Sequence, residues 1–165
     1  MAWFTRKDRQ TGERSVSRPE SPTRPDAEPP LRPVIARLGV KEQQRIDLGR
    51  QALADDGVDI DDLEAFGAAF DAALAGWMDA SKRHRESHDV IVERFAIGIG
   101  EHLARHTDLS WAVVTDAFGT DLAVAGGRDE FVVVPANLVA TRWLNAERGW
   151  VPGVVGHLVR LRAAR

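Results

Sequence analysis

The sequence predicts an α+β domain with three helices, a three-stranded antiparallel meander and two further helices, preceded by a disordered tail. Three observations predict this order. Apolar residues recur at three- and four-residue steps between residues 41 and 106, which is typical of amphipathic helices. Between residues 110 and 135, short apolar and β-branched runs alternate with turn residues, as in consecutive strands. Helical spacing then returns, without an internal repeat or a parallel crossover unit.

The N-terminal segment differs in composition from the rest of the chain. Residues 11–33 contain six of the eight prolines and few large apolar side chains. Such a segment buries too little apolar surface to offset the entropy of ordering it. We therefore expect a disordered tail, rich in Pro and Arg, over residues 1–33 and a single α+β domain over residues 34–165.

The first two helices are expected before residue 80. KEQQRIDLGRQALA, residues 41–54, predicts a helix that ends before Gly57. For the second helix we expect Asp59 as N-cap, and Val58 and Leu63 as a hydrophobic staple. The apolar face of this helix then follows at helical spacing: Leu63, Phe66, Phe70, Leu74 and Trp77.

The third helix is expected at residues 89–106. Its apolar stripe consists of Ile91, Val92, Phe95, Ile99 and Leu103. Gly98 and Gly100 interrupt it, and each glycine costs roughly 1 kcal/mol relative to alanine in a helix. Glycines retained at that cost predict that the backbone of another segment crosses this helix closely.

Three strands are expected at residues 110–116, 120–126 and 131–134. We expect Gly126–Asp129 to form an exposed hairpin turn, and Phe131–Val134 to be buried as the central strand of the meander. Pro135 ends that strand because it has no amide hydrogen to donate to the ladder. The last two helices are expected at residues 136–149 and 150–165.

The hairpin segment AGGRDEFVVV, residues 125–134, is similar to the GGDEF signature of cyclases that join two GTP molecules. Arg128 interrupts the signature, and one extra residue in a short hairpin reverses the faces to which the following side chains point. Such cyclases also place two helices between an aspartate strand and the signature strand, whereas Asp116 precedes Gly126 by only ten residues. We therefore predict a plain hairpin and not a diguanylate cyclase.

Two patterns contain side chains that bind metals. DDGVDIDDLE, residues 55–64, is acidic, but a calcium-loop register around Gly57 places alanine at two ligand positions, so a helix N-terminus is favoured. Two histidine pairs have a spacing that puts both imidazoles on one helical face: His84 with His88, and His102 with His106. Basic residues surround the first pair, and the second needs a third ligand such as Glu101 or His157. The sequence therefore predicts no metal site and no cofactor.

Charge, cysteine content and hydropathy exclude several classes of function. The tail holds seven basic and five acidic residues, and the rest of the chain holds fifteen basic and twenty acidic residues. An acidic domain is a poor nucleic-acid binder, because affinity for a polyanion depends on clustered Lys and Arg.

The chain has no cysteine, which excludes disulfides and thiolate chemistry. It has no secretory signal and no apolar run near the roughly 18 residues of a spanning helix, so we expect a cytoplasmic protein without an integral membrane segment.

Four stretches together resemble a bacterial family known as domain of unknown function 3806: QRIDLGRQALADDG, DLEAFGAAFD, GIGEHLARHTDLSWAVVTDAFGTDLAV and VVVPANLVATRW. The resemblance covers most of residues 41–160. The family's features fall on Gly98, Leu103, Trp111, Asp116, Gly119, Asp121, Pro135 and Arg142. The resemblance implies an α+β fold with this order of elements, and it implies no activity.

The absence of a converging polar motif favours a noncatalytic protein-interaction module, with an adaptor, immunity or chaperone-like role. Trp143 and Trp150 are of the type enriched at binding hot spots, so the open face of the sheet or the last helix is the expected surface for a protein partner. The alternative is that both tryptophans belong to the core. The alternative is a small-ligand or enzymatic site at Asp116, Asp121 and Arg142. No catalytic residue is assigned, and the candidate binding residues are Trp111, Asp116, Asp121, Arg142 and Trp150.

Overall fold

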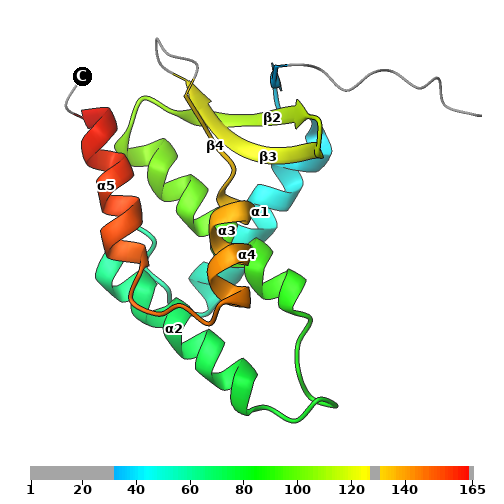
Figure 1. The fold of residues 1–165 in the computed structure, drawn as a ribbon, viewed down its shortest axis with the longest axis vertical. Coiled ribbons are helices and arrows are strands. Elements are labelled where there is room, and N and C mark those ends of the chain that lie inside the picture. The colour runs from blue at the N-terminus through cyan, green and yellow to red at the C-terminus, as the bar shows by residue number, and fades with distance from the viewer. Residues whose placement is uncertain (1–31, 127–130, 164–165) are drawn as a thin grey trace, which may run out of the picture.

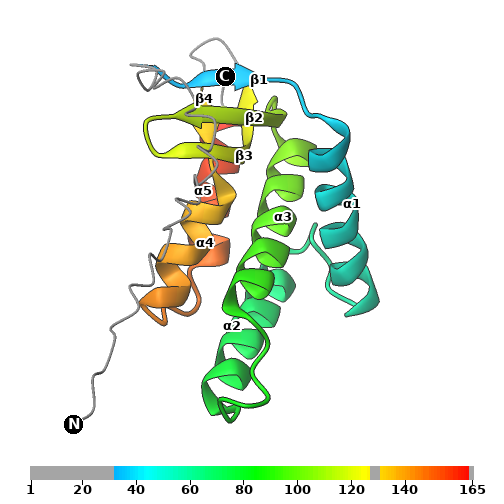
Figure 2. The ribbon, with the colours of Figure 1, turned by 90° about the vertical axis from the view of Figure 1, so that its right-hand side faces the viewer.

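The computed structural model describes residues 32–126 and 131–163, which form five helices and a four-stranded antiparallel sheet. Figures 1 and 2 show the sheet at the top of the molecule, with the helices extending from one side of it. The elements in chain order are β1 (Val34–Ala36), α1 (Val40–Asp55), α2 (Leu63–Asp79), α3 (His88–His106), β2 (Ser110–Asp116), β3 (Gly119–Gly126), β4 (Phe131–Val133), α4 (Pro135–Leu144) and α5 (Val151–Ala163).

This order confirms the predicted α+β class, with three helices before the meander and two after it. The predicted bounds of α1 and α3 are correct to within one residue at each end. The predicted tail lies outside the described residues up to residue 31. In the described ranges, no helix is both long enough and apolar enough to cross a bilayer.

The sheet has one more strand than the sequence predicts. β1 pairs with β2 in antiparallel register, with Val34 opposite Thr115 and Ala36 opposite Val113. The strand order is β1-β2-β3-β4, so helices α1, α2 and α3 all lie in the connection between the neighbouring strands β1 and β2. Three residues are too few to show the alternating pattern from which a strand is predicted.

The expectation for β4 was wrong in part. β4 is an edge strand and not the central one, and only Val133 of the segment 131–134 is buried. An edge strand has a neighbour on one side only, which leaves its side chains less covered. The predicted turn before it starts at Gly126, with φ +153°, and its residues 127–129 lie outside the described residues.

The predicted N-cap of α2 and the predicted end of α4 are also corrected. The cap is Asp62, whose side chain accepts hydrogen bonds from the amides of Glu64 and Ala65. Asp59 instead accepts the amide of Asp61 at 2.9 Å in a turn that precedes the helix. Helix α4 ends at Leu144, five residues earlier than predicted, and the chain then turns through positive φ angles at Ala146 and Gly149.

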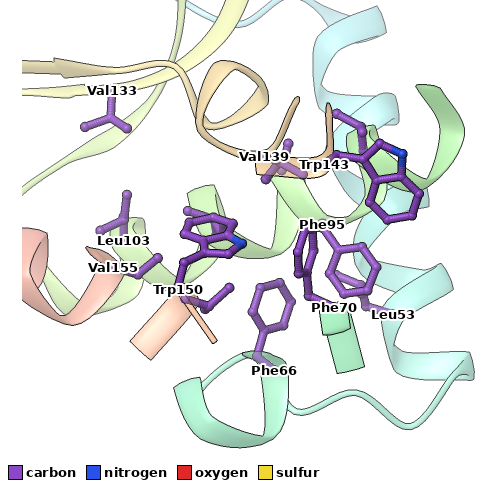
Figure 3. Packing of buried hydrophobic residues seen from close by; sticks show 14 of the residues in the cluster. Leu53, Phe66, Phe70, Phe95, Leu103, Val133, Val139, Trp143, Trp150 and Val155 are labelled. Carbon is purple, nitrogen blue, oxygen red and sulfur yellow. The ribbon is translucent and has the colours of Figure 1, made fainter. Parts of the chain in front are cut away.

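The core is centred on a group of aromatic rings between α2, α3, α4 and the start of α5. Figure 3 shows Phe70 among Phe95, Trp143 and Trp150. Phe70 meets these three rings edge to face, at centroid distances of 5.4, 5.8 and 5.6 Å. Edge-to-face pairs add about 0.5–1.5 kcal/mol each to the free energy gained by burial. Phe70 therefore joins helices that are distant in the sequence.

Helix α3 is the centre of this arrangement, and its two glycines explain how its neighbours approach it. A Cβ at Gly98 would lie 2.5 Å from the Phe66 ring and 2.9 Å from Leu53 Cδ1. A Cβ at Gly100 would lie 2.1 Å from the Trp111 ring. The sequence prediction of a close backbone crossing is therefore wrong in part, because the approach is close but side chains and not a backbone make it.

A Gly98→Ala substitution is expected to destabilise the protein by about 1–3 kcal/mol, because both side chains in its way are buried and have no room to move. Gly76→Ala in α2 is the matched control, since nothing lies within 4 Å of its Cβ position. The control is expected to gain up to about 1 kcal/mol from helix propensity. Urea unfolding measures both values, and equal effects of the two substitutions would contradict the close approach at Gly98.

Candidate functional site

The surface between α1 and α3 carries exposed apolar side chains on both walls of a groove. Leu48 on α1 is 71% exposed and Val90 on α3 is 52% exposed. Both line a cavity of about 430 Å³, whose other apolar lining comes from Gly49, Ala52 and Ile97. A Cβ at Gly49 would lie 2.4 Å from Ile97 Cδ1, so this glycine allows α1 to pack closely on α3. The groove has an apolar floor as a result.

Charged side chains surround the groove and are paired with one another. Arg45 of α1 donates to Glu93 of α3 across 2.8 Å. Arg94 lies 3.0 Å from Asp56 and 3.5 Å from Glu86. An apolar centre with a polar rim is the usual composition of a protein–protein interface.

A second, smaller pocket adjoins the groove, and the two share Arg45, Glu93 and Ile97 in their linings. The pocket has a volume of about 150 Å³. Its further lining comes from α3, from the sheet and from the start of α4: Asp89, Val92, Ala96, Trp111, Asp121, Leu122, Pro135 and Ala136. A volume of this size accommodates one side chain, which is less than the roughly 300 Å³ of a typical small-molecule site.

Two of the five predicted binding residues, Trp111 and Asp121, therefore line one pocket. Trp111 is held in place by the buried carboxylate of Glu101, which accepts its Nε1–H at 3.2 Å. Glu101 also accepts Arg105 Nε at 3.0 Å and lies 3.5 Å from Arg50 Nε. This network could not be predicted from the sequence, because Arg50 and Trp111 lie far from each other along the chain.

Asp116 lies at the end of β2 and has a local role. Its carboxylate accepts the amides of Phe118 at 2.7 Å and Gly119 at 3.2 Å. These bonds stabilise the tight turn that joins β2 directly to β3, with no helix between the two strands. The helix pair that a GGDEF cyclase places before its signature strand is therefore absent from residues 116–126.

Arg142 and Trp150 contact each other at the start of the last helix. The Arg142 guanidinium lies 4.6 Å from the centroid of the Trp150 ring and also donates to the carbonyl of Leu138 at 3.1 Å. Trp150 is only 8% exposed and belongs to the core, as does Trp143 at 4%. The structure therefore places both tryptophans in the core, which is the alternative to a contact role at the surface.

A cluster of polar side chains lies at the other end of α3, where the loop before α2 meets the helix. One ring nitrogen each of His102 and His106 and one carboxylate oxygen of Asp61 lie within 4.8 Å of one another. His106 Nε2 is 3.0 Å from Asp61 Oδ1, and Arg105 donates to Asp61 Oδ2 at 2.8 Å. The sequence indicated the shared face of the two histidines, and it did not indicate Asp61 as their neighbour.

The surroundings of His102 favour its neutral form. Burial lowers its pKa below the ordinary value of 6.5, and the nearby charges of His106 and Arg105 act in the same direction. The carbonyl of Ile60, 2.7 Å from Nδ1, and the charge of Asp61 oppose this shift. Hydrogen bonding from His106 and the charge of Arg105 lower the pKa of Asp61 below 3.8.

Comparison with protein families matches residues 73–153 to one family, described as Domain of unknown function (DUF3806). The matched segment begins within α2, contains α3, β2, β3, β4 and α4, and ends at the start of α5. Neither the search of curated proteins nor that of solved structures found a significant match.

The pKa of His102 predicts that the protein loses stability as the pH falls below 6.5. Because the folded state binds this proton less readily than the unfolded chain, the free energy of unfolding is highest above pH 6.5 and falls toward the lower folded-state pKa. The His102→Gln substitution puts a side-chain amide in place of the ring as donor to the Ile60 carbonyl. Because the amide does not titrate, the fall in the free energy of unfolding below pH 6.5 that is due to His102 is expected to disappear. Asp61 contributes in a separate window, below pH 3.8.

Urea unfolding between about pH 7.5 and 5, with EDTA present to remove metal ions, measures this dependence. His157→Gln on α5 is the matched control, since His157 is exposed. The control should keep the pH profile of the unsubstituted protein. A His102→Gln profile as steep as that of the control would show that His102 does not carry the effect.

Proposed function

Because residues 73–153 form a DUF3806 domain, whose description assigns no activity, we propose a function from the geometry: a noncatalytic, cytosolic protein-binding module. The groove between α1 and α3 is the binding surface. Its ligand is an apolar segment of a partner protein. The lack of cysteine suits a reducing compartment such as the cytosol.

The observation that carries this proposal is the pair of exposed apolar side chains on facing walls of the groove. Leu48 and Val90 are 71% and 52% exposed, and they line the groove together with Gly49 and Ile97. Apolar side chains gathered around a concave surface mark interaction sites more often than isolated ones do. A helix that lays its apolar face into such a groove is a common form of peptide recognition.

The adjoining pocket supplies an anchor point for the same partner. One apolar side chain of the partner fills this pocket and contacts Trp111 and Leu122. The ion pair of Arg45 and Glu93 belongs to the lining of both the pocket and the groove. Interfaces concentrate their binding energy in a few side chains seated in such pockets. The paired charges of the rim then favour partners whose own charges are complementary.

The alternative, a small-ligand site at Asp116, Asp121 and Arg142, has less support. Asp121 lines the pocket, whereas Asp116 bonds to its own turn and Arg142 lies over Trp150. The pocket volume of about 150 Å³ also suits a side chain better than a separate ligand. These observations favour a protein partner.

Photo-crosslinking tests the location of the surface. A photoreactive phenylalanine analogue replaces Val90 in the full chain, and replaces Leu144, which is 78% exposed on α4, as the control. After illumination in lysate of the source cells, position 90 is expected to give a discrete crosslinked partner and position 144 is not. The expected partner is another protein, and mass spectrometry distinguishes it from a second copy of the chain. The same product from both positions would contradict the proposed surface.

Substitution of the groove residues tests its contribution to affinity. Leu48→Glu and Val90→Glu each place an unpaired charge against an apolar partner surface, so the affinity for the crosslinked partner should fall at least about tenfold. Leu144→Glu, at a residue that is 78% exposed and does not line the groove, should leave the affinity unchanged. Circular dichroism checks that all three proteins are folded, and unchanged affinity in both groove variants would refute the proposal.

A further inference from the structure

We propose that Asp61, His102 and His106 form a binding site for a divalent transition-metal ion, with Zn²⁺ as the ion that two imidazoles and one carboxylate suit best. This site lies at the C-terminal end of α3. It shares no residue with the groove between α1 and α3. A test of the metal site is therefore independent of a test of the proposed protein partner.

The three side chains converge although one of them comes from a distant part of the chain. His102 and His106 lie one helical turn apart on α3, with ring centroids 4.3 Å apart. Asp61 comes from the loop before α2, and its donor atom lies within 4.8 Å of one nitrogen of each ring. Donor atoms in a tetrahedral zinc site lie about 3.3 Å apart, given bonds of about 2.0 Å. Small side-chain rotations therefore bring all three donors into coordination distance.

The hydrogen bonds around the site resemble the outer shell of known metal sites. A carbonyl oxygen can only accept, so His102 Nδ1 donates to Ile60 O at 2.7 Å, and Nε2 of the neutral ring keeps its lone pair. Metal-binding histidines commonly have their second nitrogen fixed by a carbonyl or a carboxylate in this way. The orientation and tautomer of His102 are thus set before an ion arrives.

Charge around the site permits a cation despite the neighbouring Arg105. This guanidinium donates to Asp61 Oδ2 and also to Glu101 Oε1 at 3.0 Å, so its charge is shared between two carboxylates. The C-terminal end of a helix carries a partial negative charge, and both histidines belong to the last turns of α3. Asp62 and Glu64 add two carboxylates to the same depression, and Arg160 adds one positive charge.

The depression that contains the three donors is open and has a volume of about 610 Å³. Three protein donors leave a fourth position of a tetrahedral ion for water or for another ligand. A bound ion would tie the loop before α2 to the end of α3. Since an ion bound only to the folded state stabilises it, metal binding is expected to raise Tm.

Isothermal titration of the full chain with ZnCl₂ tests the site, using protein without a histidine tag and pretreated with EDTA. The unsubstituted protein is expected to bind one ion per chain and to show a raised Tm. His106→Ala and Asp61→Asn should each lose this binding, and both residues are exposed enough for the fold to tolerate the change. His102 is left in place because it is buried.

His157→Ala is the matched control, since it removes an exposed histidine from α5 and leaves the three donors intact. It should bind Zn²⁺ as the unsubstituted protein does. Co²⁺ gives a second readout, because tetrahedral coordination produces visible absorption bands that His106→Ala should lack. The proposal is overturned if the unsubstituted protein shows no saturable binding, or if His106→Ala and Asp61→Asn bind as tightly as the control.

Discussion

The close packing of α3 against neighbours on two of its sides is the constraint on which the rest of the fold depends. Phe66 and Leu53 approach it at Gly98, and Trp111 of the sheet approaches it at Gly100. Residues two apart on a helix point to different sides, so the helices and the sheet reach α3 from different directions. Without side chains at these two positions, α3 lies closer to both layers than an ordinary helix would. The two glycines therefore allow both the sheet and α2 to pack closely on α3.

Both candidate sites follow from the position of α3. Its N-terminal half supplies Val90, Glu93 and Ile97 to the groove with α1. Its C-terminal half supplies Glu101, which fixes Trp111, and the two histidines that face Asp61. A site built on a buried helix is held more precisely than one built on loops. The two surfaces are therefore carried on one rigid element, yet they offer different chemistry: apolar contact at one end and imidazole donors at the other.

The helices could be predicted from the sequence because their apolar spacing reflects burial directly, as with Phe66, Phe70 and Leu74 of α2. β1 could not, since its strand character comes from pairing with β2 and not from its own three residues. The glycines of α3 predicted a close approach, but not that side chains make it. The candidate sites were harder to predict, because Asp61 meets His102 and Arg50 meets Glu101 only after distant segments have packed together. The residue type of Trp150 allowed both a contact role and a core position, and only the structure shows that it lies in the core.

Hydrogen–deuterium exchange of the full chain, with and without its crosslinked partner, tests most directly whether the groove on this rigid frame is the binding surface. The account predicts slower exchange upon binding in residues 45–52 of α1 and in residues 86–97, which run from the loop before α3 into its first half, because the groove lining comes from these two segments. Exchange in α5, which contributes no residue to the groove, should stay unchanged. Slower exchange confined to α4 and α5, with unchanged exchange in α1 and the first half of α3, would contradict the groove as the binding surface.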